Sequence, residues 1–396
     1  MLKITHSSTR RPPPEGYHEV FRRAKRIYDL YAGAAETSER IREVDANVNH
    51  TDTPLMLNEV RHWMQRWLKD DSAALPAGDS KRTTPMEAPK DLACLNGLRT
   101  HAVNFCIHDR FVRVASTAKP DSVASWQKRR AELLAQLAER VFRWFPKEPI
   151  PYATRTLDNR GAYVPNFAHF AERVFETEEG VPVRALVFKP KAPVSAPPLL
   201  IVVKGANDCV YFPDTDELLP LLSSNCVIVL YPRFTERTLG PSEFRDIERT
   251  AAMTGRTVAA LQVWDVMRTV RWALDEERPA PASVSVYGRG ETGIVTLYAA
   301  LFEEVINHVI LRDPPASHWQ RPALLTVLRI TDIPEVAGAL APRKLTVLGD
   351  LPEPFGLTRK IYRLLGVEPS LRRASSLANA VLEGLATGSQ AASHIS

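Results

Sequence analysis

The stretch that decides the fold is Val284-Ser285-Val286-Tyr287-Gly288-Arg289-Gly290-Glu291-Thr292-Gly293. Its first four residues are typical of a buried strand, and the glycines that follow are typical of a tight turn. The next residues, from Ile294 to Leu301, are mostly apolar. A strand that turns sharply into a helix needs small residues around the turn, because the helix must pass close to the strand. The stretch therefore predicts a strand, a glycine turn and a helix in immediate succession.

Strands and helices alternate on both sides of this turn. Short, apolar, β-branched runs have the pattern of strands buried on both faces, at 199–203, 226–230, 283–287, 308–311 and 344–348. Helical patterns lie between them, at 214–222, 244–276, 291–303 and 356–365. Upstream, the runs 168–176 and 181–188 predict an antiparallel hairpin. This order predicts an α/β fold with a three-layer, doubly wound, mostly parallel sheet.

The N-terminal part has a different pattern, which predicts a mainly helical region. Apolar residues recur at helical spacing over 17–31 and again over 51–69, where Thr53 can cap the helix. A further amphipathic helix is predicted over 120–146, and the composition of 70–92 predicts a loop or linker. We therefore expect three parts: a helical region with its linker at 1–92, a helical connector at 93–150, and the α/β domain at 151–390.

Part of the N-terminal region is similar to part of the C-terminal region. Lys25-Arg26-Ile27-Tyr28-Asp29-Leu30-Tyr31-Ala32-Gly33 matches Arg359-Lys360-Ile361-Tyr362-Arg363-Leu364-Leu365-Gly366. Further along, Asp45-Ala46-Asn47-Val48 matches Leu377-Ala378-Asn379-Ala380-Val381. Such a repeat predicts two copies of one domain type. We expect residues 17–69 to be a remnant of the C-terminal end of a first copy, and the α/β domain to be a second copy.

Taken together, these segments resemble the α/β-hydrolase superfamily and, within it, the acetyl-xylan-esterase-like carbohydrate esterases. The resemblance covers residues 165–385 and rests on Trp264–Trp272, Val286-Tyr287-Gly288-Arg289-Gly290, Arg312-Asp313-Pro314-Pro315 and Ala341-Pro342-Arg343-Lys344-Leu345. The segment Asn49-His50-Thr51-Asp52-Thr53-Pro54 resembles the final part of the same fold. The resemblance implies a carboxylic ester hydrolase, with acetylated polysaccharide such as xylan as its substrate class.

The sequence departs from that family where the chemistry would be. In the pattern G-x-S-x-G the nucleophile falls on Gly290, which has no side chain to attack an ester. The acid of this fold ends a late strand, which points to Asp350 first and to Asp313 second. The base should be a histidine near the C-terminus, and His394 is the only histidine after Asp350. We therefore expect catalysis to be impaired or absent.

A second interpretation keeps the chain active as an ester hydrolase with a non-standard set of residues. Its candidates are Ser317 or Thr292 as nucleophile, His318 or His50 as base, and Asp350 or Asp313 as acid. Adjacent side chains of an extended loop diverge, so Ser317 and His318 are not a ready dyad. Thr292 would begin a helix, where its hydroxyl suits a cap. His50 lies where the resemblance places the base of the first copy.

A third interpretation is a module that binds a sugar, a small ester or an anion without turnover. Hydrolases place the N–H groups of the oxyanion hole in the loop that here begins with Gly205 and Ala206. Arg233, Arg289 and Glu291 would lie at the carboxyl ends of strands, where ligands bind in open α/β sheets. Aromatic residues would support this interpretation at the rim, at Trp319, Tyr211 and Phe212.

The glycine turn also fits the dinucleotide-binding pattern G-x-G-x-x-G. Gly288, Gly290 and Gly293 match its glycines, and Asp313 follows about 20 residues later. That pattern normally follows the first strand of its unit, whereas here a hairpin and a long helix precede it. We therefore favour the hydrolase interpretation and expect no cofactor.

Composition argues against several other classes of protein. Lys and Arg number 51 and Asp and Glu 46, and this small, dispersed excess argues against a nucleic-acid partner. The four cysteines form no CxxC or Cys/His cluster, so we expect no metal site. The sequence shows no apolar run of signal-peptide or membrane-span length. We expect a soluble protein without a membrane partner, cytoplasmic as written, or exported if the chain is a fragment of a longer precursor.

Overall fold

The chain forms two compact units, Met1–Ala102 and Val103–Ser396, each with its own sheet. The structure is a computed structural model, and it describes residues 2–6, 14–31, 40–46, 51–69, 87–95, 97, 99, 101–116, 119–158, 169–190, 194–205, 215–235, 240–277 and 279–386.

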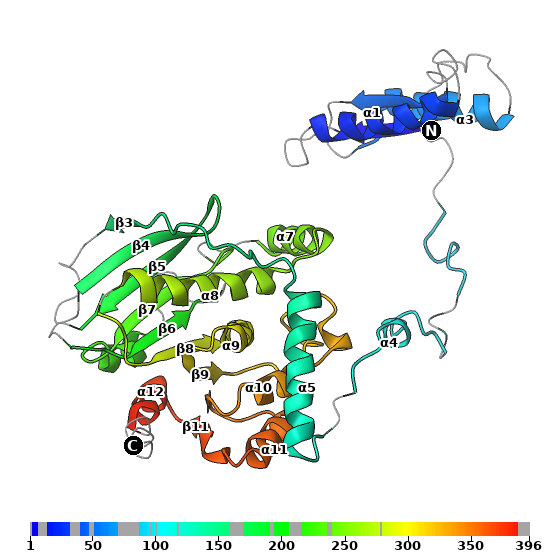
Figure 1. The fold of residues 1–396 in the computed structure, drawn as a ribbon. Coiled ribbons are helices and arrows are strands. Elements are labelled where there is room, and N and C mark those ends of the chain that lie inside the picture. The colour runs from blue at the N-terminus through cyan, green and yellow to red at the C-terminus, as the bar shows by residue number, and fades with distance from the viewer. Residues whose placement is uncertain are drawn as a thin grey trace. The chain divides into compact units, whose positions relative to one another are not determined.

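The second unit is built on a mixed sheet, which has nine strands within the described residues (Figure 1). Their order is β11-β10-β9-β8-β6-β7-β5-β4-β3. The bounds are Arg155–Asp158 for β3, His169–Glu178 for β4, Val181–Lys189 for β5, Leu199–Val203 for β6, Cys226–Tyr231 for β7, Val284–Arg289 for β8, Ile306–Arg312 for β9, Lys344–Leu348 for β10 and Leu371–Ala374 for β11. Strands β6 to β11 are parallel, and β3, β4 and β5 extend the sheet in antiparallel fashion. The predicted hairpin and the predicted mostly parallel sheet are confirmed.

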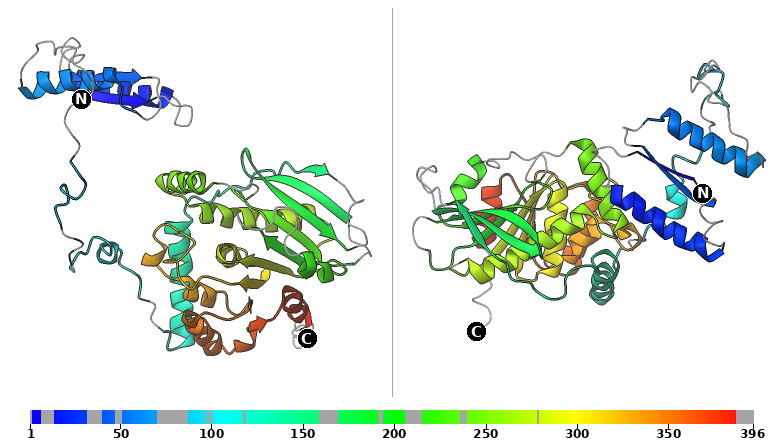
Figure 2. Two further views of the ribbon diagram at one scale, coloured as in Figure 1. Left: turned by 180° about the vertical axis from the view of Figure 1, so that it is seen from behind. Right: turned by 90° about the horizontal axis from the view of Figure 1, so that it is seen from above.

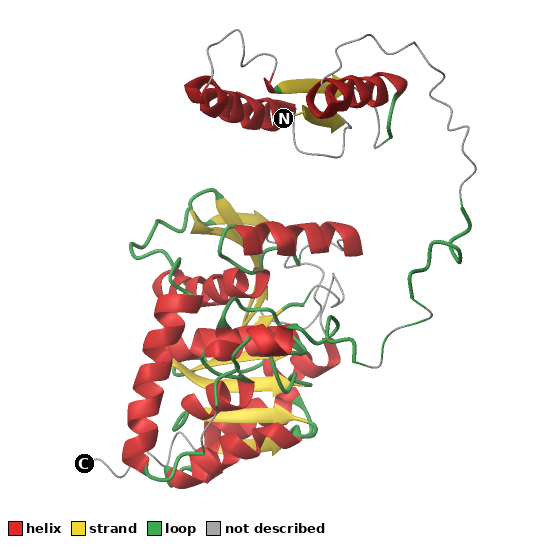
Figure 3. Ribbon diagram, turned by 90° about the vertical axis from the view of Figure 1, so that its right-hand side faces the viewer, coloured by secondary structure: helices red, strands yellow, loops and turns green. Residues whose placement is uncertain are grey.

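Helices cover both faces of this sheet (Figures 1 and 3). They are α5 (Val123–Gln136), α6 (Thr215–Leu218), α7 (Pro241–Met253), α8 (Val258–Glu276), α9 (Glu291–Phe302), α10 (Ile333–Ala339), α11 (Gly356–Leu364) and α12 (Leu377–Ala386). The short helix α4 (His108–Phe111) lies in the segment before α5 and has no buried residue. The helices α5, α8, α9, α10 and α11 contribute to the core on one face, and α6 and α12 to the core on the other. This arrangement confirms the predicted three layers. No described helix is long and apolar enough to cross a membrane.

The central strands alternate their side chains between the two cores. In β6, Leu199, Ile201 and Val203 face the side of α8, whereas Leu200 and Val202 face the side of α12. All five are buried because helices cover both faces. A strand covered on both faces is apolar at every position instead of every second one. This explains why the sequence predicted the central strands so directly.

The structure also differs from the predicted elements. The expected helix at 244–276 is two helices, α7 and α8, because Gly255 between them has a φ of 78°. Thr257 then caps α8, since its hydroxyl accepts a hydrogen bond from the N–H of Ala260 at 3.2 Å. The strands β3 and β11, at the two edges of the sheet, were not predicted.

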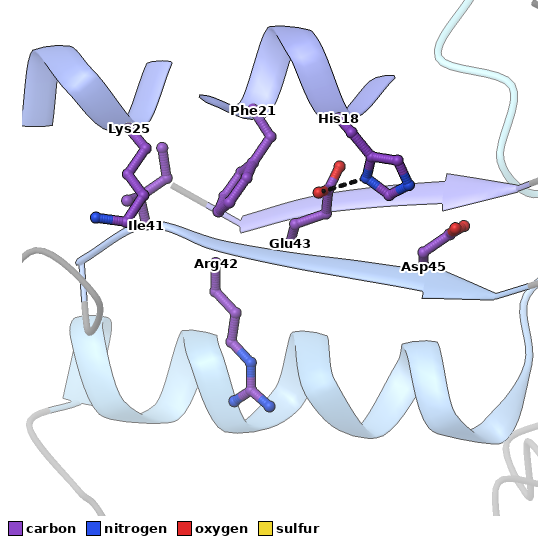
Figure 4. Close-up of a pocket in the computed structure, with 7 residues that line it drawn as sticks. All are labelled: His18, Phe21, Lys25, Ile41, Arg42, Glu43 and Asp45. Carbon is purple, nitrogen blue, oxygen red and sulfur yellow. Dashed lines mark hydrogen bonds and ion pairs between the residues drawn. The ribbon is translucent and has the colours of Figure 1, made fainter. Parts of the chain in front are cut away.

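The first unit has the element order β1-α1-β2-α3. Strands β1 (Leu2–His6) and β2 (Arg42–Ala46) pair in parallel, and the helices α1 (Pro14–Tyr31) and α3 (Pro54–Lys69) lie on opposite sides of the pair (Figures 2 and 4). The hydroxyl of Thr53 accepts a hydrogen bond from the N–H of Met56 at 3.2 Å and so caps α3. Both predicted helices are confirmed, and the two strands are an addition that the sequence did not predict.

A buried histidine links β9 to β10 in the second unit. His308 Nε2 lies 2.8 Å from the hydroxyl of Thr346, and both side chains are buried. Burial, together with the positive charges of Lys344 and Arg372, lowers the pKa of His308 from 6.5 to about 3. The imidazole is therefore neutral in the folded chain down to strongly acidic pH.

We expect the second unit to lose stability as the pH falls from about 6.5 towards 3. In this window the unfolded chain binds a proton that the buried imidazole of His308 does not, so acidification favours unfolding. Urea unfolding at a series of pH values measures the slope of the free energy of unfolding against pH. His308→Gln should reduce it, whereas His108→Gln, at an exposed histidine, should leave it unchanged. An unaltered slope in His308→Gln would contradict this explanation.

Candidate functional site

The glycine turn joins β8 to α9 with Gly290 as its single connecting residue. A Cβ atom at Gly288 would overlap the backbone carbonyl group of Thr292, and one at Gly293 would lie 3.0 Å from the carbonyl oxygen of Gly288. Glycine is therefore required at position 288, because the helix starts directly against the end of the strand. The turn has the geometry that its sequence predicted.

Gly290 occupies the position of the nucleophilic serine in the pattern G-x-S-x-G. Its φ of 56° and ψ of −122° are rarely adopted by residues with a side chain. Its N–H donates to the carbonyl oxygen of Arg312 at 2.8 Å, which fixes the turn to the end of β9. A Cβ atom at position 290 would meet no atom within 4 Å. The turn thus has room for a side chain that the sequence does not supply.

Thr292, a candidate nucleophile, closes the same turn. Its hydroxyl accepts a hydrogen bond from the N–H of Arg289 at 3.1 Å and donates to the carbonyl oxygen of Arg289 at 3.0 Å. The side chain is buried. Both hydrogen bonds stabilise the backbone of the turn, as expected for a capping hydroxyl.

The two candidate acids lie in exposed ion pairs with arginine. Asp313 Oδ2 is 3.3 Å from Arg289 Nε, and both side chains are more than half exposed. Asp350 pairs with Arg373, and its own side chain is 95% exposed. Each carboxylate follows the end of a parallel strand, but neither forms a hydrogen bond with an imidazole in the part of the chain that the structure describes.

Ser317 and His318 bind one carboxylate instead of each other. The hydroxyl of Ser317 donates to Asp332 Oδ2 at 2.5 Å, and the backbone N–H of His318 donates to Asp332 Oδ1 at 2.9 Å. Asp332 also accepts the N–H of Ile333 at 2.8 Å and so caps α10. The structure therefore joins this loop to α10 and does not form a serine–histidine pair.

The imidazole of His318 is enclosed between Tyr298 and Pro322. Its Nδ1 lies 2.8 Å from the carbonyl oxygen of Pro322, which can only accept, so Nδ1 carries the proton. Its Nε2 then accepts the hydroxyl proton of Tyr298 at 2.8 Å. Burial lowers the pKa of His318 and raises the pKa of Tyr298, so both groups stay neutral. Both ring nitrogens already have partners within the core.

Arg233 is the centre of a buried ion-pair cluster. Its guanidinium binds Asp265 of α8 and Glu178 at the end of β4, and its backbone N–H donates to Asp265 Oδ2 at 3.0 Å. Asp265 is fully buried, and the side chain of Arg233 is 10% exposed. Burial disfavours the charge of Arg233, but the negative charges of Asp265 and Glu178 outweigh it and raise its pKa. This arginine joins three segments of the fold.

Charged side chains that were not predicted from the sequence lie at the carboxyl end of β9. Arg312, the last residue of that strand, donates to both carboxylate oxygens of Glu217 in α6, at 2.8 and 2.7 Å. Its guanidinium carbon lies 5.8 Å from the ring centroid of Tyr287 in β8, and Lys204 after β6 is buried. These side chains lie at the carboxyl edge of the sheet, where ligands bind in open α/β folds. Glu217 and Arg312 are 95 residues apart, so no local pattern could have revealed the pair.

The remaining predicted residues are placed as follows. Gly205 directly follows Lys204 and is half-buried. Glu291 begins α9, where its carboxylate lies 3.9 Å from Arg321 Nε, and burial raises its pKa. Outside the described residues lie Ala206, His50, His394, Tyr211 and Phe212. Among the described residues, no group of three or more His, Cys, Asp or Glu could hold a metal ion.

Comparison with solved structures shows which fold this geometry belongs to. A putative acetyl xylan esterase from Bacteroides fragilis NCTC 9343 superimposes with a TM-score of 0.58 at 13% identity, over 75% of this chain and 88% of that one. A glucuronoyl esterase from Solibacter usitatus superimposes with a TM-score of 0.50 at 13% identity, over 70% of this chain and 99% of that one. No family model and no curated protein matches the sequence. The chain thus has an α/β-hydrolase fold of the kind found in carbohydrate esterases, as predicted.

We expect Arg233→Ala to lower the free energy of unfolding by about 3–5 kcal/mol, because it leaves the buried carboxylate of Asp265 without its partner. Arg289→Ala removes an exposed pair and should cost at most about 1 kcal/mol. Chemical denaturation of the full chain measures both changes. Similar losses in the two variants would rule out a special role for Arg233.

Proposed function

We propose that the second unit is a non-catalytic module with an α/β-hydrolase fold, in which ester hydrolysis is impaired or absent. The observation that carries this proposal is Gly290 at the turn between β8 and α9. Acyl transfer needs a nucleophilic side chain at this place. The backbone leaves room for one, and the residue supplies none.

The charges around the turn support the same proposal. A catalytic carboxylate acts by orienting a histidine through a hydrogen bond. Asp313 and Asp350 pair with arginines instead. A guanidinium stays protonated in proteins and cannot act as a general base. Nearby, Arg312 and Glu217 form a further ion pair at the carboxyl edge of the sheet. The arrangement suits a structural or binding role.

An active hydrolase that uses Ser317 has less support. A base must form a hydrogen bond with the nucleophile in order to activate it. The hydroxyl of Ser317 donates to Asp332, whereas the imidazole of His318 binds Tyr298 and Pro322. Ser317, His318 and Asp332 thus lie close together in the sequence. No hydrogen bond joins the serine hydroxyl to the imidazole, so a proton cannot pass between them.

Hydrolysis of p-nitrophenyl acetate and of acetylated xylan by the full chain tests the main proposal. We expect the rate to equal that in buffer, because Gly290 offers no nucleophile. Gly290→Ser should also stay inactive, since the described residues place no imidazole as a base beside the turn. Turnover by the parent chain above the rate in buffer would overturn the proposal. Its loss in Ser317→Ala or His50→Ala would assign the activity to the non-standard set of residues.

Gly290→Ala is the matched control for Gly290→Ser. Both add a side chain at a φ of 56°, so each should lower stability by about 1–3 kcal/mol, and thermal unfolding measures this loss. Only the serine variant adds a hydroxyl. Activity gained by the serine variant alone would assign the loss of catalysis to this single position.

Binding of an acetylated carbohydrate without turnover is a second candidate function. Trp319, on the loop after β9, is half exposed, and its ring centroid lies 5.6 Å from that of His108. Two residues further, Arg321 lies 3.9 Å from Glu291 at the start of α9, so this loop borders the glycine turn. An exposed indole offers an apolar face with a polar N–H at its edge, which suits the surface of a sugar ring.

Calorimetric titration with acetylated xylo-oligosaccharides tests this second candidate. We expect Trp319→Ala to weaken binding by about tenfold or more, as for an aromatic residue central to an interface. Met253→Ala, at an exposed residue of α7, should leave the affinity unchanged. The absence of saturable binding by the parent chain would reject the candidate.

A further inference from the structure

The first unit has the same topology as the last part of the second unit. In the second unit β10, α11, β11 and α12 follow one another, and the two strands pair in parallel. In the first unit β1, α1, β2 and α3 do the same. The helices lie on opposite faces in both cases. Ile361 of α11 and Leu377 of α12 belong to different cores, and α1 and α3 lie on either side of their strands (Figure 4).

The stronger of the two sequence matches falls on corresponding helices. It pairs residues 25–31 of α1 with residues 359–365, which run along α11 to its end, so that Ile27 corresponds to Ile361. The other match does not join equivalent elements, because Asp45-Ala46 ends a strand whereas residues 377–381 begin a helix. The shared topology and the helix match both support the correspondence.

The corresponding residues differ in burial. Ile361 is fully buried, and a Cβ atom at Gly338 would overlap its side chain, so α10 packs tightly on α11. Ile27 is 56% exposed. Val20, two helical turns before Ile27, and Tyr31, one turn after it, lie on the same side of α1 and are 57% and 88% exposed. We call Val20, Ile27 and Tyr31 the α1 stripe. It is an apolar surface where the second unit has a packed interface.

The strand pair of the first unit is also incompletely covered. A cavity of about 470 Å³ opens between α1 and β2 (Figure 4). His18 and Glu43 border it and contact each other, with 3.0 Å between Nδ1 and Oε2. In the second unit, β10 pairs on both sides, with β9 and with β11. Within the described part of the first unit, β1 pairs with β2 alone. Its other edge can accept a parallel strand.

We propose that the first unit docks through β1 and the α1 stripe onto the edge of another α/β-hydrolase-type sheet and completes that sheet. The partner is a sheet that ends in a strand equivalent to β9, with a helix equivalent to α10 beside it. The correspondence identifies this partner, because β9 and α10 are the elements that cover β10 and α11 in the second unit. This inference is independent of whether the second unit hydrolyses esters.

The acceptor for the test is this chain ended after Arg343, which leaves the edge of β9 open, and it is used only once hydrogen exchange has shown that β6 to β9 stay protected in it. The acceptor also carries Val20→Asp, so that its own first unit does not compete with the donor for the open edge of β9. The donor is the full chain with Ile27→Cys, and mass spectrometry follows the reaction of the introduced thiol with a maleimide. We expect the acceptor to slow this reaction by about tenfold or more, because docking covers the α1 stripe. Adding Val20→Asp to the donor should abolish the effect.

Two results of this experiment would overturn the proposal. One is the absence of protection by an acceptor that keeps the circular dichroism spectrum of a folded α/β protein. The other is equal protection by the intact chain, whose β9 is already paired with β10. In that case the α1 stripe would be an interface between two copies of this chain.

A second measurement needs only the full chain and holds even if the acceptor does not fold. Ile27→Asp and Ile361→Asp form a matched pair. Ile361→Asp should abolish the cooperative unfolding of the second unit, because it buries a charge without a partner. Ile27→Asp should leave hydrogen exchange in β1 and β2 unchanged, since the α1 stripe is exposed in this chain. Loss of exchange protection in Ile27→Asp would overturn the proposal and make Ile27 a core residue.

Discussion

The backbone of α9 passes so close to the end of β8 that position 288 has no room for a Cβ atom. This contact holds an almost entirely buried helix against the centre of the sheet, with every residue from Thr292 to Leu301 buried. Gly288 and Gly293 are therefore needed for packing, whatever the chemistry. Position 290 is limited only by its backbone conformation. The fold can persist without a nucleophile because packing and catalysis depend on different residues of one turn.

The ion pairs of the second unit differ in how strongly they hold the structure. Arg233 and Asp265 are buried, so each needs the other, and together they connect α8 to the end of β4. The exposed pair of Arg289 and Asp313 contributes about 0–1 kcal/mol and leaves the backbone contacts to hold the turn. The sequence placed Arg233 correctly after a strand. It could not show that the partner is 32 residues away on a helix, because no local pattern encodes a tertiary ion pair.

The fold was more predictable than the site, for a physical reason. A strand such as β7 is buried at every position, so its apolar run is visible in the sequence. The edge strands β3 and β11 are short and rich in polar residues, and their sequences resemble loops. The described side chains of β3 are exposed, and those of β11 are mostly half-buried. Site residues depend on pairings across the whole chain. Ser317 and His318 are neighbours in sequence, but Asp332 and Tyr298, which decide what their side chains do, lie in separate helical segments.

The local sequence of a helix does not determine whether another element packs against it, as the first unit shows. Ile27 and Ile361 have similar neighbours in sequence, and each lies on a helix that joins two parallel strands, yet one is exposed and the other buried. The described core of the first unit consists of Ile41, Val44 and Met56, beside a sheet of two strands. Two strands are marginal on their own, and a third strand adds both hydrogen bonds and buried surface. A strand paired with the edge of β1 would therefore add to the stability of this unit.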